Sequence, residues 1–160
     1  MASLTGQIGL RRNSTGFIGK CIEWATNSTT HHVVVAVSET VCISAEPKGV
    51  RFRNISDYPH LDWSRFDHDG AARERIIDAA WTYRRRPYNF AIYIPLLWRR
   101  LTGAPVSPWL ARWLAQRPNE NCSQLAADIY RDAGFKLFDQ SADIITPGDW
   151  ERLFAARAWL

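Results

Sequence analysis

The chain has 160 residues, of which 46% are hydrophobic and 22% charged, and its formal net charge is +4. This length and composition predict a single globular domain over residues 1–160 and exclude an intrinsically disordered chain. The three cysteines are too few and too widely spaced for a disulfide framework or a close-spaced metal-binding pair, so we expect no metal and no cofactor. The odd, sparse set of cysteines favours a reducing compartment, and we see neither a secretory signal nor a membrane-spanning run.

The N-terminal part predicts a helix. Residues 1–12 are polar and contain glycine, and we interpret them as a lead-in to the fold. A helix is expected from Ser14 or Thr15, either of which can cap it, to about Asn27. Cys21 belongs to the apolar stripe of this helix, so we assign it to packing.

Three strands are expected next. Residues 33–37 are consecutive small apolar residues, which is typical of a strand covered on both faces. Residues 41–46 follow a short turn and should pair antiparallel with the first strand. Residues 50–53 alternate between apolar and basic side chains, which indicates a half-exposed strand. Together with the helices, these strands predict the α+β class.

The middle of the chain is polar at first and then strongly aromatic. Residues 54–70 predict a loop, and residues 71–83 a helix with Trp81 among its inward side chains. Residues 88–101 are apolar but too short for a membrane span, so we favour a place in the core. Residues 108–115 predict a short helix rich in tryptophan.

A helix at 121–134 carries a cysteine in its first turn. Asn121 is a good N-cap, Gln124 follows three residues later as in a capping box, and Gly134 supplies the stop. Cys122 would be the first helical residue, where backbone N–H groups and the helix dipole favour an anion and lower the pKa of a thiol. Alternatively, Cys122 is a small buried apolar residue, as most free cysteines are.

The last helix is expected over residues 147–158. Thr146 is a suitable N-cap, Pro147 suits the first helical position and Asp149 the third.

A cysteine nucleophile needs a base, and the base needs a polar group that orients its ring. His60 and His68 lie in the predicted loop, and we assign them to the solvated surface. His31 and His32 come at the start of a buried strand, where the sheet holds the backbone in place, and alternation puts one on each face.

Ser44 and Glu46 share one face of the second strand, so either could orient a histidine. A carboxylate would do so better than a hydroxyl. The register between the two strands is not determined by the sequence, so the face that meets each histidine stays open.

In this order the residues resemble the permuted papain-like hydrolases of the NlpC/P60 superfamily, which include YiiX-like proteins and many small phage proteins. In that branch a strand with the histidine precedes the helix with the cysteine. The segments that carry the resemblance are 16–28, 32–37, 44–50, 87–90, 121–125 and 146–149.

The resemblance implies a papain-like domain with a small antiparallel sheet packed against helices, a histidine on a strand and a cysteine at a helix N-terminus. It makes Cys122 the nucleophile and His32, rather than His31, the base. The orienting glutamate of the family aligns with Ser44, and Glu46 could replace it from two residues further on. Asn89 stands where the family has aspartate, and we give it a structural role.

We therefore expect a cysteine hydrolase that cleaves a peptide or cell-wall peptide bond through a thioester, with backbone N–H groups of the cysteine helix binding the oxyanion. The alternatives are a lipid acyltransferase or esterase of the lecithin-retinol acyltransferase type, with residues 88–101 at a membrane, and an inactive structural or binding module of a phage particle. Expected partners are a peptide or peptidoglycan-like substrate and other phage structural proteins. The chain is expected in the cytoplasm or the virion. The sequence contains no motif that reads a nucleic-acid groove beside the arginines at 84–86, so we expect no nucleic-acid partner.

Overall fold

The computed structural model describes residues 3–87, 98–99, 101–104, 107–109 and 121–160. The expectations for residues 88–97, which include Asn89, lie outside the described residues, as does the tryptophan-rich helix beyond residue 109.

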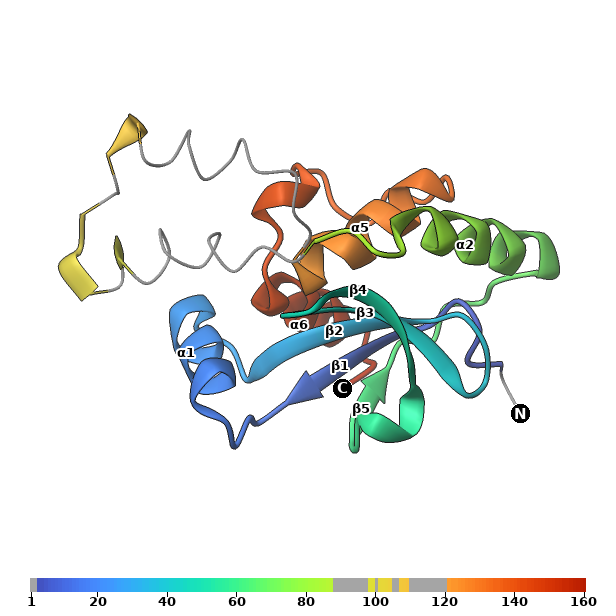
Figure 1. The fold of residues 1–160 in the computed structure, drawn as a ribbon, viewed down its shortest axis with the longest axis horizontal. Helices are drawn as coiled ribbons and strands as arrows, with labels where there is room; N and C mark the ends of the chain where they lie inside the picture. Colours follow the sequence, from blue (N-terminus) through green and yellow to red (C-terminus); the bar gives the residue numbers. More distant parts are fainter. Residues whose placement is uncertain (1–2, 88–97, 100, 105–106, 110–120) are drawn as a thin grey trace.

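The described chain is α+β, as the sequence predicts, with a five-stranded antiparallel sheet in the order β4-β3-β2-β1-β5 (Figure 1). The pairing of β2 with β3 is antiparallel, which confirms the expected hairpin. The strands are β1 (Ile8–Arg12), β2 (Thr30–Ala36), β3 (Val41–Glu46), β4 (Gly49–Asn54) and β5 (Leu61–Trp63).

The interpretation of residues 1–12 as a lead-in is wrong, because β1 lies inside the sheet between β2 and β5. Ile8 and Leu10 are fully buried and pair with Val35 and Val33. The strand has too few apolar residues to stand out in the sequence, and its burial comes from neighbours distant in the chain. In the same way β5 forms within the predicted loop 54–70.

Four helices have both ends within the described residues: α1 (Phe17–Thr26), α2 (Gly70–Tyr83), α5 (Cys122–Asp132) and α6 (Pro147–Ala156). All four lie where the sequence predicts a helix. The N-cap of α1 is Gly16 and not the expected Ser14 or Thr15. At α2 a local signal is present, since Asp69 caps this helix by accepting a hydrogen bond from the Ala72 N–H. Thr146 and Asp149 form a capping box at the start of α6.

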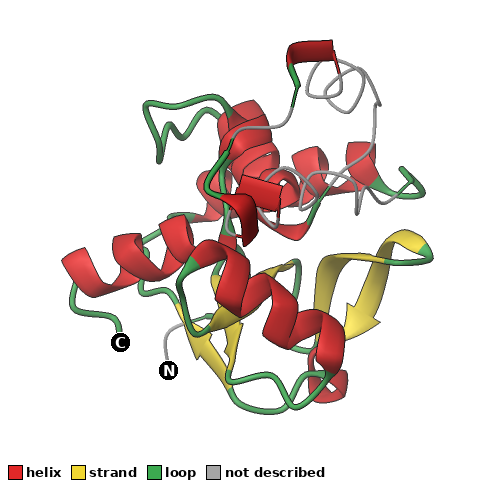
Figure 2. Cartoon of the chain, turned by 90° about the vertical axis from the view of Figure 1, so that its left-hand side faces the viewer, coloured by secondary structure: helices red, strands yellow, loops and turns green. Residues whose placement is uncertain are grey.

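Helices and loops cover different faces of the sheet. Val33 and Val35 of β2 share one hydrophobic cluster with Leu125 and Ile129 of α5, and we call this face of the sheet the helix face. Figure 1 shows α2 and α5 on the same side of the strands, and Figure 2 views the molecule from the end where α1 crosses in front.

The opposite face carries a smaller cluster in which Val34 and Cys42 pack with Tyr58, and we call it the Tyr58 face. The register pairs Val34 with Ser44, so Ser44 and Glu46 also belong to the Tyr58 face. This register decides which strand residues can meet each histidine.

Candidate functional site

A polar network on the Tyr58 face joins three of the four site residues expected from the sequence. Nε2 of His32 lies 2.8 Å from Oγ of Ser44, and the Tyr58 hydroxyl lies 2.9 Å from the same Oγ. The Tyr58 hydroxyl also makes a short hydrogen bond to Oε1 of Glu46. Nε of Arg53 lies 3.5 Å from that carboxylate oxygen. We call this series of hydrogen-bonded side chains, His32–Ser44–Tyr58–Glu46, the relay.

Tyr58 is the member of the relay that sequence reasoning missed. It comes from the segment between η1 (Ile55–Asp57) and β5, which is part of neither β2 nor β3, and its ring stacks on His32 with 5.6 Å between the centroids. A tyrosine in a polar loop carries no local signal for this role.

The direction of the hydrogen bonds in the relay follows from counting protons. A phenol has one proton and a carboxylate only accepts, so Tyr58 donates to Glu46. The Ser44 hydroxyl can then give its proton to the Tyr58 oxygen, and the Ser44 oxygen accepts from Nε2–H of His32. Nδ1 of His32 is then the ring nitrogen that carries a lone pair.

Burial determines the charge state of this network. Burial, with further effects from His31 and Arg11, lowers the pKa of His32 to about 3, so the ring is neutral at neutral pH. Burial and the nearby Glu46 carboxylate raise the pKa of Tyr58, so its hydroxyl remains a donor. His32 is therefore a proton acceptor at rest and not an imidazolium.

Cys122 is the first residue of α5, as the sequence predicts. Oδ1 of Asn121 accepts hydrogen bonds from the N–H groups of Ser123 (3.0 Å) and Gln124 (2.9 Å), which confirms the N-cap. Those two N–H groups of the first turn are thereby engaged by the cap. The Cys122 residue is 1% exposed and belongs to the hydrophobic cluster of the helix face.

The structure places His32 and the cysteine helix on different faces of the sheet. Alternation puts His32 on the Tyr58 face with Val34, whereas α5 packs on Val33 and Val35. The expected ion pair between the Cys122 thiolate and the His32 imidazolium stays a prediction.

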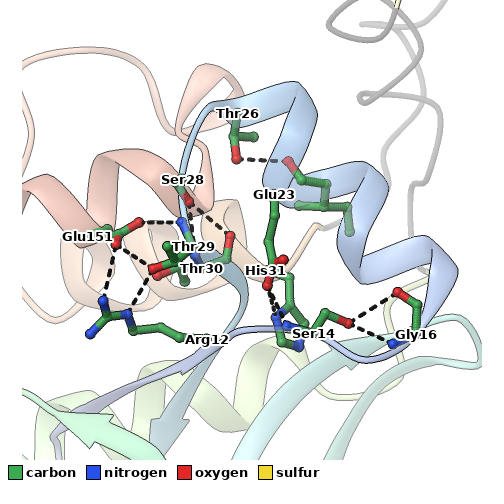
Figure 3. A network of polar contacts seen from close by, with 11 residues as sticks. Arg12, Ser14, Gly16, Glu23, Thr26, Ser28, Thr29, Thr30, His31 and Glu151 are labelled. Carbon is green, nitrogen blue, oxygen red and sulfur yellow. Dashed lines mark hydrogen bonds and ion pairs between the residues drawn. The ribbon is translucent and has the colours of Figure 1, made fainter.

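The other histidine of β2 has a carboxylate partner (Figure 3). The β1–β2 register pairs Arg11 with His32 and Arg12 with Thr30, so His31 is the extra residue of a β-bulge, which re-aims its side chain. Nδ1 of His31 lies 2.9 Å from Oε1 of Glu23 in α1, and that oxygen also accepts from the Ser14 N–H. Burial lowers the pKa of His31, while Glu23 acts in the opposite direction.

The two loop histidines differ from each other. His60 is exposed, as expected. The assignment of His68 to the solvated surface is wrong, because this residue is 7% exposed and its Nε2 lies 3.2 Å from the Tyr130 hydroxyl. The fold brings α5 over the loop, and the sequence of the loop contains no sign of this.

Two hollows among the described residues lie away from the relay. One of about 630 Å³ lies between α1 and α6, with Glu23 and Trp24 in its lining. Another, of about 570 Å³, is lined by residues around Phe135 and Leu137. Neither lining includes Cys122 or His32.

Within the described part of the chain, no group of three or more His, Cys, Asp or Glu residues could hold a metal ion. The helices described there include none long and apolar enough to cross a membrane. Neither a scan against models of known protein families nor a search of curated proteins finds a match for this chain.

Proposed function

We propose that this protein is a cysteine hydrolase of permuted papain-like fold that cleaves an amide bond in a peptide or cell-wall peptide. The observation that carries the proposal is the relay, since a catalytic imidazole needs one ring nitrogen held by protein groups and the other ready to accept a proton. The late helix that begins at Cys122 supplies the thiol.

In the proposed reaction, Nδ1 of His32 takes the thiol proton as Sγ of Cys122 attacks the carbonyl carbon. The tetrahedral intermediate then loses the amine, which leaves with the proton from the imidazolium, and a thioester remains. Water, deprotonated by the same ring, hydrolyses the thioester.

The reaction requires the His32 ring and the Cys122 sulfur to meet. The burial of Cys122 and the position of His32 on the other sheet face favour a second candidate, a binding module of the same fold without catalysis. Reactivity of the thiol distinguishes the two candidates.

The test is alkylation by iodoacetamide, followed at each cysteine by mass spectrometry. Cys42 is an internal standard, because burial, with a further effect from Glu46, raises the pKa of its thiol to about 12. For a hydrolase, Cys122 reacts much faster than Cys42, and the His32→Ala variant loses this advantage. Equal, slow labelling of Cys122 and Cys42 would exclude the hydrolase and support the binding module without catalysis.

A matched variant, His31→Ala, separates the two imidazoles of β2. It should keep the fast labelling of Cys122, because His31 is held by Glu23 outside the relay. If His31→Ala slows the labelling and His32→Ala does not, the base is His31 rather than His32, and Cys122 remains the nucleophile. Soluble peptidoglycan fragments and peptides then serve as substrates, with Cys122→Ala expected to abolish turnover.

A further inference from the structure

A strip of basic residues runs along the β4 edge of the sheet. β4 is the outermost strand, and residues 84–86 lie against it through two backbone hydrogen bonds. The Arg85 N–H donates to the Val50 carbonyl (3.0 Å), and the Val50 N–H donates to the Arg86 carbonyl (2.8 Å). These bonds fix the backbone from which the arginine side chains project.

Most cations of this strip lack an acidic partner among the described residues. Neither residues 47–53 nor residues 81–87 contain an aspartate or glutamate. Arg53 is paired with Glu46 and Asp57. Within the described residues, no ion pair joins a carboxylate to four further exposed cations, Lys48, Arg51, Arg84 and Arg85. We call these four residues the basic edge.

An exposed indole lies beside the basic edge. The sequence predicts Trp81 as an inward residue, but it is 53% exposed, which corrects that expectation. Its ring centroid lies 4.5 Å from that of Phe52 on β4, and the Arg84 guanidinium lies 5.5 Å from the indole. An exposed tryptophan among arginines is the combination that favours the interface of a bilayer.

We propose that the basic edge and Trp81 form a docking surface for an anionic lipid bilayer. Basic residues near an anionic lipid surface gain electrostatic energy without a shaped pocket, and the indole inserts at the level of the headgroups. A single-stranded nucleic acid fits less well, because it needs open ring faces for stacking bases, and Phe52 and Arg84 already lie against the indole.

The experiment is co-sedimentation of the full chain with phosphatidylcholine vesicles that either contain or lack phosphatidylserine. We expect binding only to the vesicles with phosphatidylserine, and weaker binding as salt rises. The double variant Arg84→Gln, Arg85→Gln should lower the partition coefficient about 25-fold. Each basic residue near an anionic surface contributes about 1 kcal/mol, or about fivefold. Trp81→Ala should weaken binding further.

The matched control is the double variant Lys20→Gln, Arg65→Gln, which makes the same change in net charge elsewhere. Lys20 lies on α1, and Arg65 follows β5 at the opposite edge of the sheet. An equal loss of binding in the control would show that net charge, not the basic edge, drives association and would overturn the proposal. The proposal would also be overturned if the protein bound neither kind of vesicle, or if it bound a single-stranded oligonucleotide but no vesicles. Circular dichroism checks the fold of each variant.

Discussion

His32 shows how the surroundings of one residue set its chemistry. An exposed histidine has a pKa near 6.5, whereas burial lowers that of His32 to about 3. As the pH falls below about 6.5, the unfolded chain binds a proton at this position and the folded chain does not. The contribution of His32 to stability is therefore complete above that pH and is lost progressively as the pH falls towards 3.

The pH dependence of stability tests this environment. Between about pH 7 and pH 5, His32 should account for a loss of about 2 kcal/mol in the free energy of unfolding. In urea unfolding, His32→Gln should lack that part of the pH dependence, whatever the variant does to stability at pH 7. His60→Gln, at an exposed position, is the control and should keep the slope of the unaltered protein. An unchanged slope in His32→Gln would contradict a neutral, partly buried ring.

At the scale of elements, local signals predicted α5 and α6, while pairing between distant segments built the edge of the sheet at β4. The contact between β4 and residues 84–86 depends on the backbone conformation of Gly49. Its φ is +98°, and an added Cβ would lie 2.9 Å from the Arg86 carbonyl oxygen. That oxygen accepts the hydrogen bond from Val50, so the clash would push residues 84–86 away from β4.

Gly49→Ala should therefore destabilise the protein by more than the strain of a positive φ alone. Gly134→Ala is the matched control, because its φ is +91° and nothing lies within 4 Å of the added Cβ. We expect Gly134→Ala to cost about 1 kcal/mol in chemical unfolding and Gly49→Ala clearly more. Hydrogen exchange should show faster exchange of the Val50 and Arg85 amides in Gly49→Ala alone. Equal behaviour of the two variants would mean that the 84–86 segment does not depend on this contact.

At the scale of the whole molecule, Trp150 connects the last helix to the cysteine helix. It is fully buried, its Nε1 donates to the Ser123 carbonyl (3.2 Å), and its ring meets Phe138 edge to face. The high tryptophan content of the chain is compatible with a core, a cleft or a docking surface. The fold assigns Trp150 to the core and Trp81 to the surface.

Trp150→Ala should lower the free energy of unfolding by about 3–5 kcal/mol, the usual cost of removing a large core aromatic. The comparison is Trp81→Ala, which loses only the contacts of a half-exposed ring and should cost much less. Urea unfolding measures both. Similar losses in the two variants would contradict the packing of α6 against α5.

The sequence by itself determined the elements whose signals are local. Capping residues locate α5 and α6, consecutive β-branched residues mark β2, and the alternation of β3 puts Ser44 and Glu46 on one face. The tertiary structure alone decided which faces meet. β1 forms only because β2 and β5 flank it, Tyr58 completes the relay from a loop, and Glu23 reaches His31 from another helix. The reason is that capping and periodicity act within a few residues of the chain, whereas the side on which a histidine lies depends on register and packing between segments far apart in sequence.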